Sequence, residues 1–434
     1  MALSKKPYKG CRDFFPKDMR IRDFLFDKMK QTATRFAYEA YDGPLLEEVN
    51  LYKAKSGEEL INDQIYSFTD RGNREVAIRP EMTPTLARMV ANIHKELPKP
   101  IRWYSIPNLL RYEKPQRGRV REHWQFNVDI FGAPENLGEI EILSLIVEFL
   151  LSFGATKEMF SILINDRKVV DTVFKKLLSL EDEQAYKLYK VIDKSKKVTT
   201  EKLDHMISEI IDEESKKEIF KTYINIKTVS ELKNFLEKHN VINECSQFLS
   251  FLEMTQNLFF NEYIKYDPTI VRGLDYYTGL VFEIFDEHPE NNRAIAGGGA
   301  YANLLQIFNE SPMGGIGFGL GDVTLKDFLE SHNLLGDFSK AENDLLLVYT
   351  NDEEEIETMQ LAHKLRGENL KIETHLGKIK FNKIFKLAES KGHNFVGIVE
   401  SKDGTISVQI KNLKDKSTDT IQVNEIEKIK TYIM

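Results

Sequence analysis

The stretch HWQFNVDI, residues 123–130, decides the fold class, because apolar and polar side chains alternate along it without a break. One face of the strand that it predicts is apolar and carries Trp124, Phe126, Val128 and Ile130. The other face is polar and carries His123, Gln125, Asn127 and Asp129. Such a strand is typical of an antiparallel sheet that is covered on one side only. The polar face has no lysine and no glutamate, so it predicts a lined cleft rather than a solvated surface.

A basic segment, RYEKPQRGRVR at residues 111–121, comes directly before this strand. It has five basic residues and a single acid, Glu113, in a chain whose formal net charge is −8. Pro115 and Gly118 favour a hairpin loop between two strands over a helix. Arginine side chains bind phosphate with two parallel hydrogen bonds, so the loop predicts a nucleotide or nucleic-acid contact. A solvated basic turn is the alternative for such a loop taken alone.

Composition places the chain among globular proteins with more than one domain. Its 434 residues are enough for two or three buried cores. Cys11 and Cys245 are the only cysteines, which argues against disulfides and thiolate zinc sites. The histidines form no metal-binding motif, so no bound metal is predicted. No apolar run reaches membrane-spanning length, and the N-terminus lacks an apolar signal core. We therefore expect a cytoplasmic protein without a membrane contact.

Periodicity outlines several further elements. An amphipathic helix is expected over about 18–41 and a second one from Thr83, with Pro84 at its first position. Lysine- and glutamate-rich helical segments fill 165–265, and strand patterns return at 270–285 in TIVRGLDYY and GLVFEIF. From about residue 341 a β-α-β-α-β alternation predicts a separate α/β domain with a largely parallel sheet.

Two glycine-rich segments, AGGGAYANLL at 296–305 and MGGIGFGLGD at 313–322, lie between these regions. Glycine allows a backbone to approach a neighbour closely, although an isolated glycine run is more often a flexible turn. Neither segment matches a phosphate loop or a dinucleotide-binding fingerprint. If the protein uses ATP, it therefore does so through arginines on an antiparallel sheet.

Taken in order, these motifs resemble the histidyl-tRNA synthetase family of class II aminoacyl-tRNA synthetases. Residues 111–132 resemble that family's motif 2, and IRPEMTPTLAR at 78–88 resembles the segment before it. RGLDYYTGLVFE at 272–283 and AGGGAYANLL resemble its two histidine-specific signatures, and MGGIGFGLGD falls where motif 3 belongs. The resemblance implies an α+β fold with an antiparallel catalytic sheet, a helical insertion and a C-terminal anticodon-binding α/β domain.

The resemblance also implies domain boundaries and an activity. The catalytic domain would span 1–164 and 266–335, with the insertion at 165–265 and the anticodon-binding domain at 341–434. The reaction would be ATP-dependent activation of L-histidine to histidyl-adenylate, followed by transfer to the 3′ end of tRNA(His). Magnesium would accompany ATP, and motif 1 would make the protein a homodimer.

Site residues follow from the same resemblance. Those expected to bind histidine are Glu81, Met82, Thr83, Arg111, Gln125, Asp129, Arg272, Tyr276 and Tyr277. Asp129 would accept a hydrogen bond from the imidazole, and Tyr277 would complete that pocket. Those expected to bind ATP are Arg111, Glu113, Arg119 and Arg121. Arg272 and Arg111 would be catalytic at the α-phosphate. Those expected to meet the tRNA acceptor end are Lys114, Gln116 and Arg117.

The chain departs from the family pattern in two places. Ala300 and Ala302 stand where the second signature usually has Arg and Asp. The motif 3 segment has no arginine, and its nearby polar residues are Asp322 and Thr324, so Arg117 is a candidate to replace it. A synthetase-like regulatory subunit of histidine biosynthesis, without aminoacylation activity, is therefore the alternative. A non-enzymatic RNA-binding paralogue would have lost the phosphate arginines, which remain here.

Overall fold

The computed structural model describes residues 3–54, 60–195, 198–271, 276–291, 293–340 and 343–434. The chain divides into two compact units. Unit 1 comprises residues 1–13 and 22–336, and unit 2 comprises residues 14–21 and 337–434. Arg272 and the three residues after it, which the sequence places in the first signature, lie outside the described residues.

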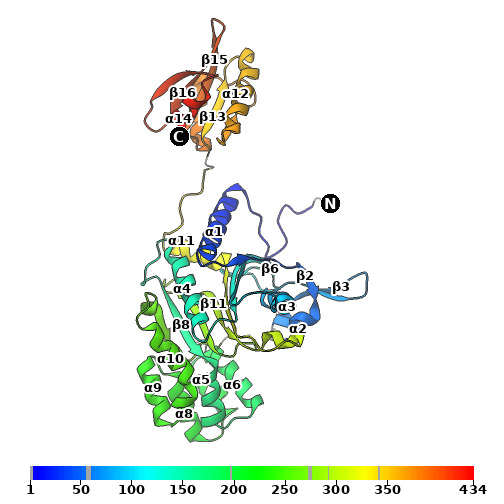
Figure 1. The fold of residues 1–434 in the computed structure, drawn as a ribbon, viewed down its shortest axis with the longest axis vertical. Coiled ribbons are helices and arrows are strands. Elements are labelled where there is room, and N and C mark those ends of the chain that lie inside the picture. The colour runs from blue at the N-terminus through cyan, green and yellow to red at the C-terminus, as the bar shows by residue number, and fades with distance from the viewer. Residues whose placement is uncertain (1–2, 55–59, 196–197, 272–275, 292, 341–342) are drawn as a thin grey trace. The chain divides into compact units, whose positions relative to one another are not determined.

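The core of unit 1 is a mixed, mainly antiparallel sheet (Figure 1). Among the described residues its strands run in the order β1-β5-β7-β12-β11-β10-β8-β9, with β6 paired to β7. The strands are β1 (Glu39–Ala40), β5 (Ile101–Ser105), β6 (Asn108–Leu110), β7 (Glu122–Phe131), β8 (Phe160–Asp166), β9 (Ile264–Tyr266), β10 (Leu280–Asp286), β11 (Ala294–Tyr301) and β12 (Gly315–Gly321). The β1–β5 and β8–β9 pairs are parallel and the other pairs are antiparallel. The predicted α+β fold with a mainly antiparallel sheet is thereby confirmed.

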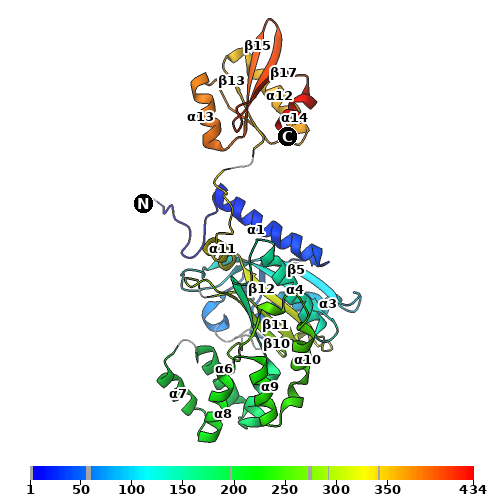
Figure 2. The ribbon, with the colours of Figure 1, turned by 90° about the vertical axis from the view of Figure 1, so that its left-hand side faces the viewer.

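Helix α4 (Leu137–Leu151) and helix α11 (Asp322–Ser331) pack on the apolar face of this sheet, as Figure 2 shows. Phe126, in the middle of β7, is fully buried with its ring centroid 5.4 Å from that of Phe149 on α4. Its ring also lies 5.6 Å from Phe318 of β12, edge to face. The covered apolar face that the 123–130 alternation predicts is therefore present.

Helix α1 (Pro16–Arg35) ends earlier than the sequence predicts. The expected helix over about 18–41 stops because Ala37 takes a left-handed conformation with φ of 59°. The Tyr38 N–H donates to the Ala33 carbonyl at 3.0 Å, which is the hydrogen bond of a helix C-terminus. The chain then enters β1, so the prediction that this helix ends at Gly43 and Pro44 is wrong. Competition from a sheet edge decided the boundary here.

A small antiparallel sheet follows, in the order β2-β4-β3. Its strands are β2 (Leu46–Glu48), β3 (Tyr66–Thr69) and β4 (Glu75–Ile78), with α2 (Val49–Lys53) after β2. Helix α3 (Thr83–Ile93) then begins one residue before the predicted position, with Met82 as its N-cap residue. The strand predicted at TIVRGLDYY is wrong for its described part, because Asp267 to Ile270 form a turn closed by the Ile270 N–H on the Asp267 carbonyl.

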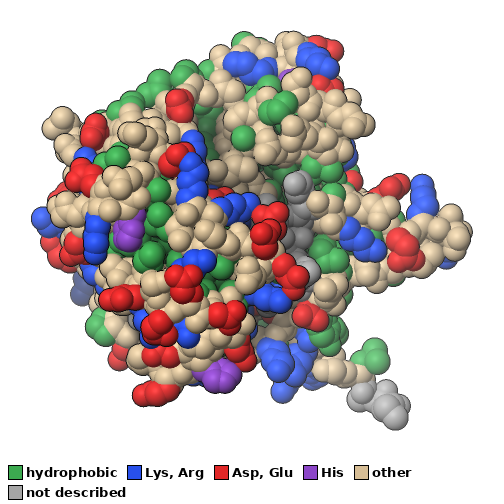
Figure 3. Space-filling view, turned by 90° about the horizontal axis from the view of Figure 1, so that it is seen from below, with side chains coloured by type: hydrophobic (Ala, Val, Ile, Leu, Met, Phe, Trp, Pro, Cys, Tyr) green, Lys and Arg blue, Asp and Glu red, His purple; other side chains and the backbone are tan. Residues whose placement is uncertain are grey.

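Residues 167–255 are almost entirely helical, as their composition predicts. The helices are α5 (Arg167–Asp171), α6 (Asp182–Ser195), α7 (Thr200–Ser208), α8 (Glu214–Ile224), α9 (Val229–Lys238) and α10 (Ser246–Thr255). Figure 3 views the molecule from the end that carries α8 and shows acidic and basic side chains interspersed over that face.

Unit 2 carries a five-stranded sheet in the order β14-β13-β15-β16-β17. Its elements are β13 (Leu345–Tyr349), α12 (Glu355–Gly367), β14 (Ile372–Thr374), α13 (Phe381–Lys391), β15 (Phe395–Lys402), β16 (Thr405–Asn412), β17 (Thr418–Gln422) and α14 (Ile426–Ile433). The first three strands of the order pair in parallel, as predicted. The last two strands, β16 and β17, add antiparallel pairs, so the prediction of a largely parallel sheet is wrong. Asp403 and Gly404, both at positive φ, form the hairpin turn that adds β16.

Candidate active site

The polar face of β7 is opposed by alternate glycines of β12. Gly317 is paired with Asp129 and Gly319 with Asn127. A Cβ atom built at Gly317 would lie 2.1 Å from Asp129 Oδ1, and one built at Gly319 would lie 2.7 Å from Gln125 Cδ. Such distances are far below van der Waals contact. Glycine is therefore required in β12 because the side chains of β7 occupy the space above it.

Asp129 lies at the bottom of this face and is held by a tyrosine from β11. The Tyr301 hydroxyl donates a hydrogen bond of 2.6 Å to Asp129 Oδ1, and both side chains are buried. Tyr276 packs edge to face on Tyr301, with ring centroids 6.0 Å apart, and the Tyr277 ring lies 4.8 Å from Tyr276. A Cβ atom at Gly299 would lie 2.6 Å from Tyr277 Cδ1, so this glycine makes room for the Tyr277 ring. A buried cluster of tyrosine rings with an acid among them results.

Burial raises the pKa of the Asp129 carboxyl to about 7, and the hydrogen bond from Tyr301 acts in the opposite direction. The cause is desolvation, because removing a carboxylate from water favours its neutral form. Asp129 is therefore an acid whose charge depends on what binds beside it. A ligand that carries an N–H donor or a positive charge would favour the ionised form.

This raised pKa predicts a pH-dependent cost in stability. The folded protein binds a proton at Asp129 between the unfolded pKa, about 3.9, and the folded pKa near 7. The stability contributed by that proton is present at low pH and is lost as the pH rises through this window. Asp129→Asn keeps the acceptor for Tyr301 and removes the titration. We expect its free energy of unfolding, relative to the native chain, to increase from pH 4.5 to pH 8 in urea titrations. Parallel profiles for the two proteins would contradict this account.

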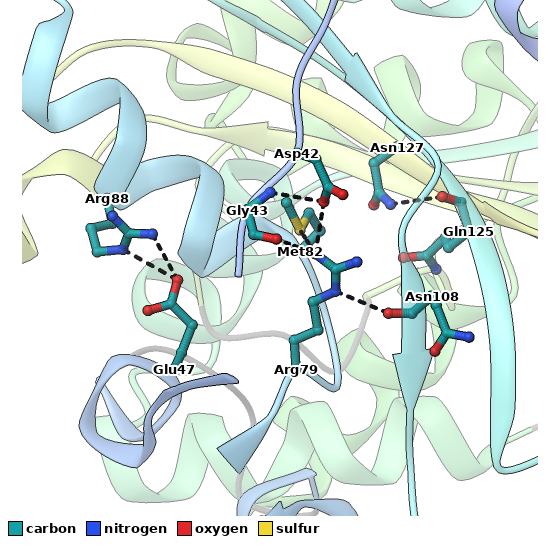
Figure 4. Close-up of polar contacts among 9 residues, drawn as sticks. All are labelled: Asp42, Gly43, Glu47, Arg79, Met82, Arg88, Asn108, Gln125 and Asn127. Atoms are coloured by element: carbon teal, nitrogen blue, oxygen red, sulfur yellow. Dashed lines mark hydrogen bonds and ion pairs between the residues drawn. The ribbon is translucent and has the colours of Figure 1, made fainter. Parts of the chain in front are cut away.

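The segment of residues 80–83 forms one wall of the site. Glu81 is buried, and the Tyr276 hydroxyl lies 3.4 Å from its Oε2 atom. The buried Arg79 side chain supports the segment from behind (Figure 4). Arg79 Nε donates to the Asn108 carbonyl at 2.9 Å, and Nη1 donates to both Asp42 Oδ1 and the Gly43 carbonyl at 2.8 Å. Because β6 and the 42–43 turn are both tied to Arg79, this wall is rigid.

Arg111 joins the basic loop to the same wall. Its Nε atom donates to the carbonyl of Pro80, the residue before Glu81, at 2.8 Å. Its backbone N–H donates to the Arg121 carbonyl at 2.8 Å, which closes the base of the loop. His123 is on the polar face of β7, and burial, followed by the charges of Arg111 and Arg12, lowers the pKa of its imidazole to about 3. The imidazole is therefore neutral and adds no charge to this region.

The other ATP residues expected from the sequence lie in the loop, but not all are directed alike. Arg119 is 60% exposed, with Nη1 3.6 Å from Glu113 Oε2. Arg121 is buried instead, with its guanidinium 3.9 Å above the Tyr112 ring and Nη1 donating to the Tyr8 hydroxyl at 3.0 Å. Arg121 thus stabilises the loop in this structure, whereas Arg119 is open to a ligand.

The two polar residues near the missing motif 3 arginine have structural partners. Asp322 makes an ion pair of 2.8 Å with Arg12 and accepts the Trp124 N–H at 3.0 Å. Thr324 Oγ1 lies within hydrogen-bond distance of the Ile295 carbonyl, at 3.0 Å, and of the Gly321 carbonyl, at 3.1 Å. Asp322 thus ties the start of α11 to β7, and Thr324 ties it to β11.

Most of the predicted site residues therefore converge on one face. Those brought together around β7 are Glu81, Thr83, Arg111, Gln125, Asp129, Tyr276 and Tyr277. Met82 is buried, with Sδ 3.9 Å from Arg79 Nη1, and so lines the wall from behind. The three predicted tRNA contacts, Lys114, Gln116 and Arg117, are exposed in the loop.

Tyr301 and Arg79 were missed by the sequence analysis. A tyrosine two residues after the glycine run was the available signal for Tyr301, since it follows the same alternation as Gly299. Arg79 was part of the quoted segment 78–88, but nothing in a linear motif separates a buried supporting arginine from one that meets a ligand.

Comparisons with known proteins agree on one family. The family model described as histidyl-tRNA synthetase matches residues 10–323. The chain is 42% identical to a histidine–tRNA ligase of Leptospira biflexa over 99% of its length and 98% of that protein. It is 33% identical to a histidine–tRNA ligase of Thermoplasma volcanium, covering 96% of each chain.

A solved histidyl-tRNA synthetase from Nostoc sp. PCC 7120 superposes with a TM-score of 0.80, covering 99% of this chain and all of that one. At 21% identity this likeness concerns the fold. The family match and the two near full-length relatives carry the assignment, and they agree with the motifs on the strands described above. The chain belongs to the histidyl-tRNA synthetase family.

Proposed function

We propose that the face formed by β7, β12 and β11 is where this histidine–tRNA ligase binds histidine and ATP and forms histidyl-adenylate. The observation that carries the proposal is the buried Asp129–Tyr301 pair, packed among tyrosine rings and glycines, with Asp129 on the strand that follows the loop bearing Arg111. An acid in that position suits an imidazole, and a guanidinium at the pocket wall suits a phosphate. Histidine-dependent exchange between ATP and pyrophosphate tests the proposal directly.

The imidazole would lie in the pocket, with its N–H donating to Asp129. Tyr276 and Tyr277 would cover the ring. Glu81, Thr83 and Gln125 would receive the α-ammonium group, since an anion and neutral acceptors match its three donors. An aliphatic amino acid would offer Asp129 no hydrogen bond in place of the imidazole N–H. A site built this way rejects such analogues strongly.

The ATP α-phosphate would lie beside Arg111 and Arg272. Arg119, with Arg121 and Glu113, would complete the nucleotide site towards the outer phosphates. A histidine carboxylate oxygen attacks the α-phosphorus, a new P–O bond forms, and the bond to the pyrophosphate oxygen breaks, so pyrophosphate leaves with the electron pair. The carboxylate is already ionised, so no base is needed. Positioning and stabilisation of the growing phosphate charge supply the catalysis.

Magnesium would arrive with the nucleotide. Among the described residues, no group of three or more His, Cys, Asp or Glu could hold a metal. Proteins commonly hold Mg²⁺ through only one or two carboxylates together with the substrate phosphates. Glu113 would supply one ligand, because its Oε2 atom is buried and receives no hydrogen bond from the described residues. When bound, the ion neutralises phosphate charge.

Transfer to tRNA(His) would use the exposed loop residues Lys114, Gln116 and Arg117 at the acceptor end. The catalytic domain would be 1–164 and 266–335, the insertion 165–265, and the anticodon-binding domain 341–434.

A homodimer is also proposed, since Leu45 and Leu46 after α1 are 48% and 46% exposed in the single chain. No helix among the described residues is long and apolar enough to cross a membrane. A cytoplasmic location is part of the proposal.

A truncation separates the roles of the two units. Ending the chain at Lys340 keeps the carbonyls of Phe338 and Ser339, which accept hydrogen bonds from Arg20. We expect histidine-dependent pyrophosphate exchange to be retained and tRNA(His) charging to fall much further, because only charging needs the anticodon contact. Sedimentation establishes the oligomeric state of the truncated protein. Equal loss of both activities in a folded protein with unchanged assembly would exclude an anticodon-binding role for residues 341–434.

A further inference from the structure

The turn between β10 and β11 presents an arginine to the tip of the basic loop. The loop tip is ordered, since Gln116 and Arg119 exchange backbone hydrogen bonds of 2.9 Å across Gly118. Gly118 has φ of 73°, and a Cβ atom built there would lie 2.5 Å from Arg293 Nη1. The three atoms nearest to that position all belong to Arg293. The guanidinium therefore occupies the space directly over the loop tip.

Arg293 is itself held firmly. The Asp286 N–H donates to the Arg293 carbonyl at 3.0 Å. The Asp286 side chain is fully buried, accepts a hydrogen bond of 2.6 Å from Asn291 Nδ2 and lies 2.8 Å from His332 Nε2. The turn that carries Arg293 is therefore anchored both within itself and to the end of α11. A guanidinium on such a base can restrain a loop that packs on it.

A carboxylate on α11 balances the arginines at this junction. Asp327 shares a small depression with Arg293, Asn291 and Thr324. Burial raises the pKa of Asp327, and the nearby charges of Arg117 and Arg293 act against that rise. Asp327 Oδ2 is buried and receives no hydrogen bond from the described residues. Arg117 Nη1 donates to the Glu290 carbonyl at 3.4 Å, so the loop tip contacts the β10–β11 turn twice.

We propose that Arg293 is a positioning residue for ATP binding. Its side chain holds the tip of the 111–121 loop, so that Arg111 and Arg119 contact the phosphates together. The inference rests on the proposed nucleotide site. Arg293 acts through Gly118, and Asp327 lies in the same depression as Arg293. Helix α11, with the sequence DVTLKDFLES, has no arginine, and Arg293, the residue just before β11, restrains the loop instead.

The test measures histidine-dependent pyrophosphate exchange in the full-length chain. Arg293→Ala is expected to raise the ATP KM about tenfold, which corresponds to losing an interaction of about 1.4 kcal/mol. The histidine KM should stay within about twofold, and Arg293→Lys should recover only part of the loss. Arg74→Ala removes an arginine from a surface turn, where Arg74 is 69% exposed and paired with Asp70, and is the control.

A double-mutant cycle shows whether Arg293 acts through the loop. Gly118→Ala introduces backbone strain in any background, but its clash with Arg293 exists only when Arg293 is present. Its effect on the ATP KM should therefore be smaller in Arg293→Ala than in the native chain. Equal effects in both backgrounds, or a histidine KM that rises as much as the ATP KM, would overturn the proposal. Exchange that is absent from the native chain would instead overturn the proposed function.

Discussion

Replacing Arg111 with alanine is expected to slow histidyl-adenylate formation by roughly 10²–10³-fold, the usual loss when one preorganised donor to a developing charge is removed. Arg111 is preorganised because its Nε atom is already bonded to the Pro80 carbonyl at 2.8 Å. That bond ties the Arg111 side chain to the residue before Glu81, while Glu81 itself is in contact with Tyr276. One side chain would thus align the phosphate with the amino-acid pocket.

Single-turnover formation of the adenylate, with saturating histidine and ATP, measures this loss. Arg111→Lys should recover only part of the rate, because a point charge cannot keep the Pro80 hydrogen bond and the phosphate contact in the same geometry. Arg74→Ala is the control for the loss of an arginine, since Arg74 is 69% exposed and bonded to Asp70 in a surface turn. A folded Arg111→Ala protein with a near-native rate would exclude a role for Arg111 at the α-phosphate.

Asp129→Ala is expected to raise the histidine KM by roughly 5- to 150-fold, which corresponds to about 1–3 kcal/mol for a buried donor left without its acceptor. The ATP KM should change little, because Asp129 lies at the far end of the polar face from the 111–121 loop. The Tyr301 hydroxyl would also lose its partner, so unfolding measurements are needed beside the kinetics. An ATP KM that rises while the histidine KM stays constant would place Asp129 in the nucleotide site instead.

Gly317→Ala tests the same contact without touching the carboxylate. The new Cβ atom would lie 2.1 Å from Asp129 Oδ1 and 2.7 Å from the Val128 carbonyl, so the Asp129 side chain must move away from Tyr301. We expect a histidine defect of the same kind, together with lower stability. Gly314→Ala is the matched control, because a Cβ atom there meets nothing within 4 Å. A similar defect in both variants would mean that general strain in this strand, rather than Asp129, is responsible.

The local sequence pattern was sufficient to predict those elements whose own residues alternate or repeat clearly. The alternation at 123–130 identified β7, its buried apolar face and the polar residues Gln125 and Asp129. Family-like order of the motifs identified the chemistry, and the comparisons confirm the family. Element ends were less predictable. The first helix stops at Arg35 because the following residues join a sheet edge, and a 3.6-residue period contains no information about that competition.

The sequence alone predicted most residues of the candidate site, whereas the tertiary structure decided how they support one another. Gly317 and Asp129 are 188 positions apart, and only the register of β12 against β7 shows that the glycine exists to leave room for the acid. Tyr301, Arg79 and Arg293 gained their roles in the same way, through contacts with Asp129, the 42–43 turn and Gly118. Arg121, expected at a phosphate, is stacked on Tyr112 in this structure, a contact that only the tertiary structure shows. The physical reason is that composition and periodicity describe neighbours along the chain, while packing and hydrogen bonding act between neighbours in space.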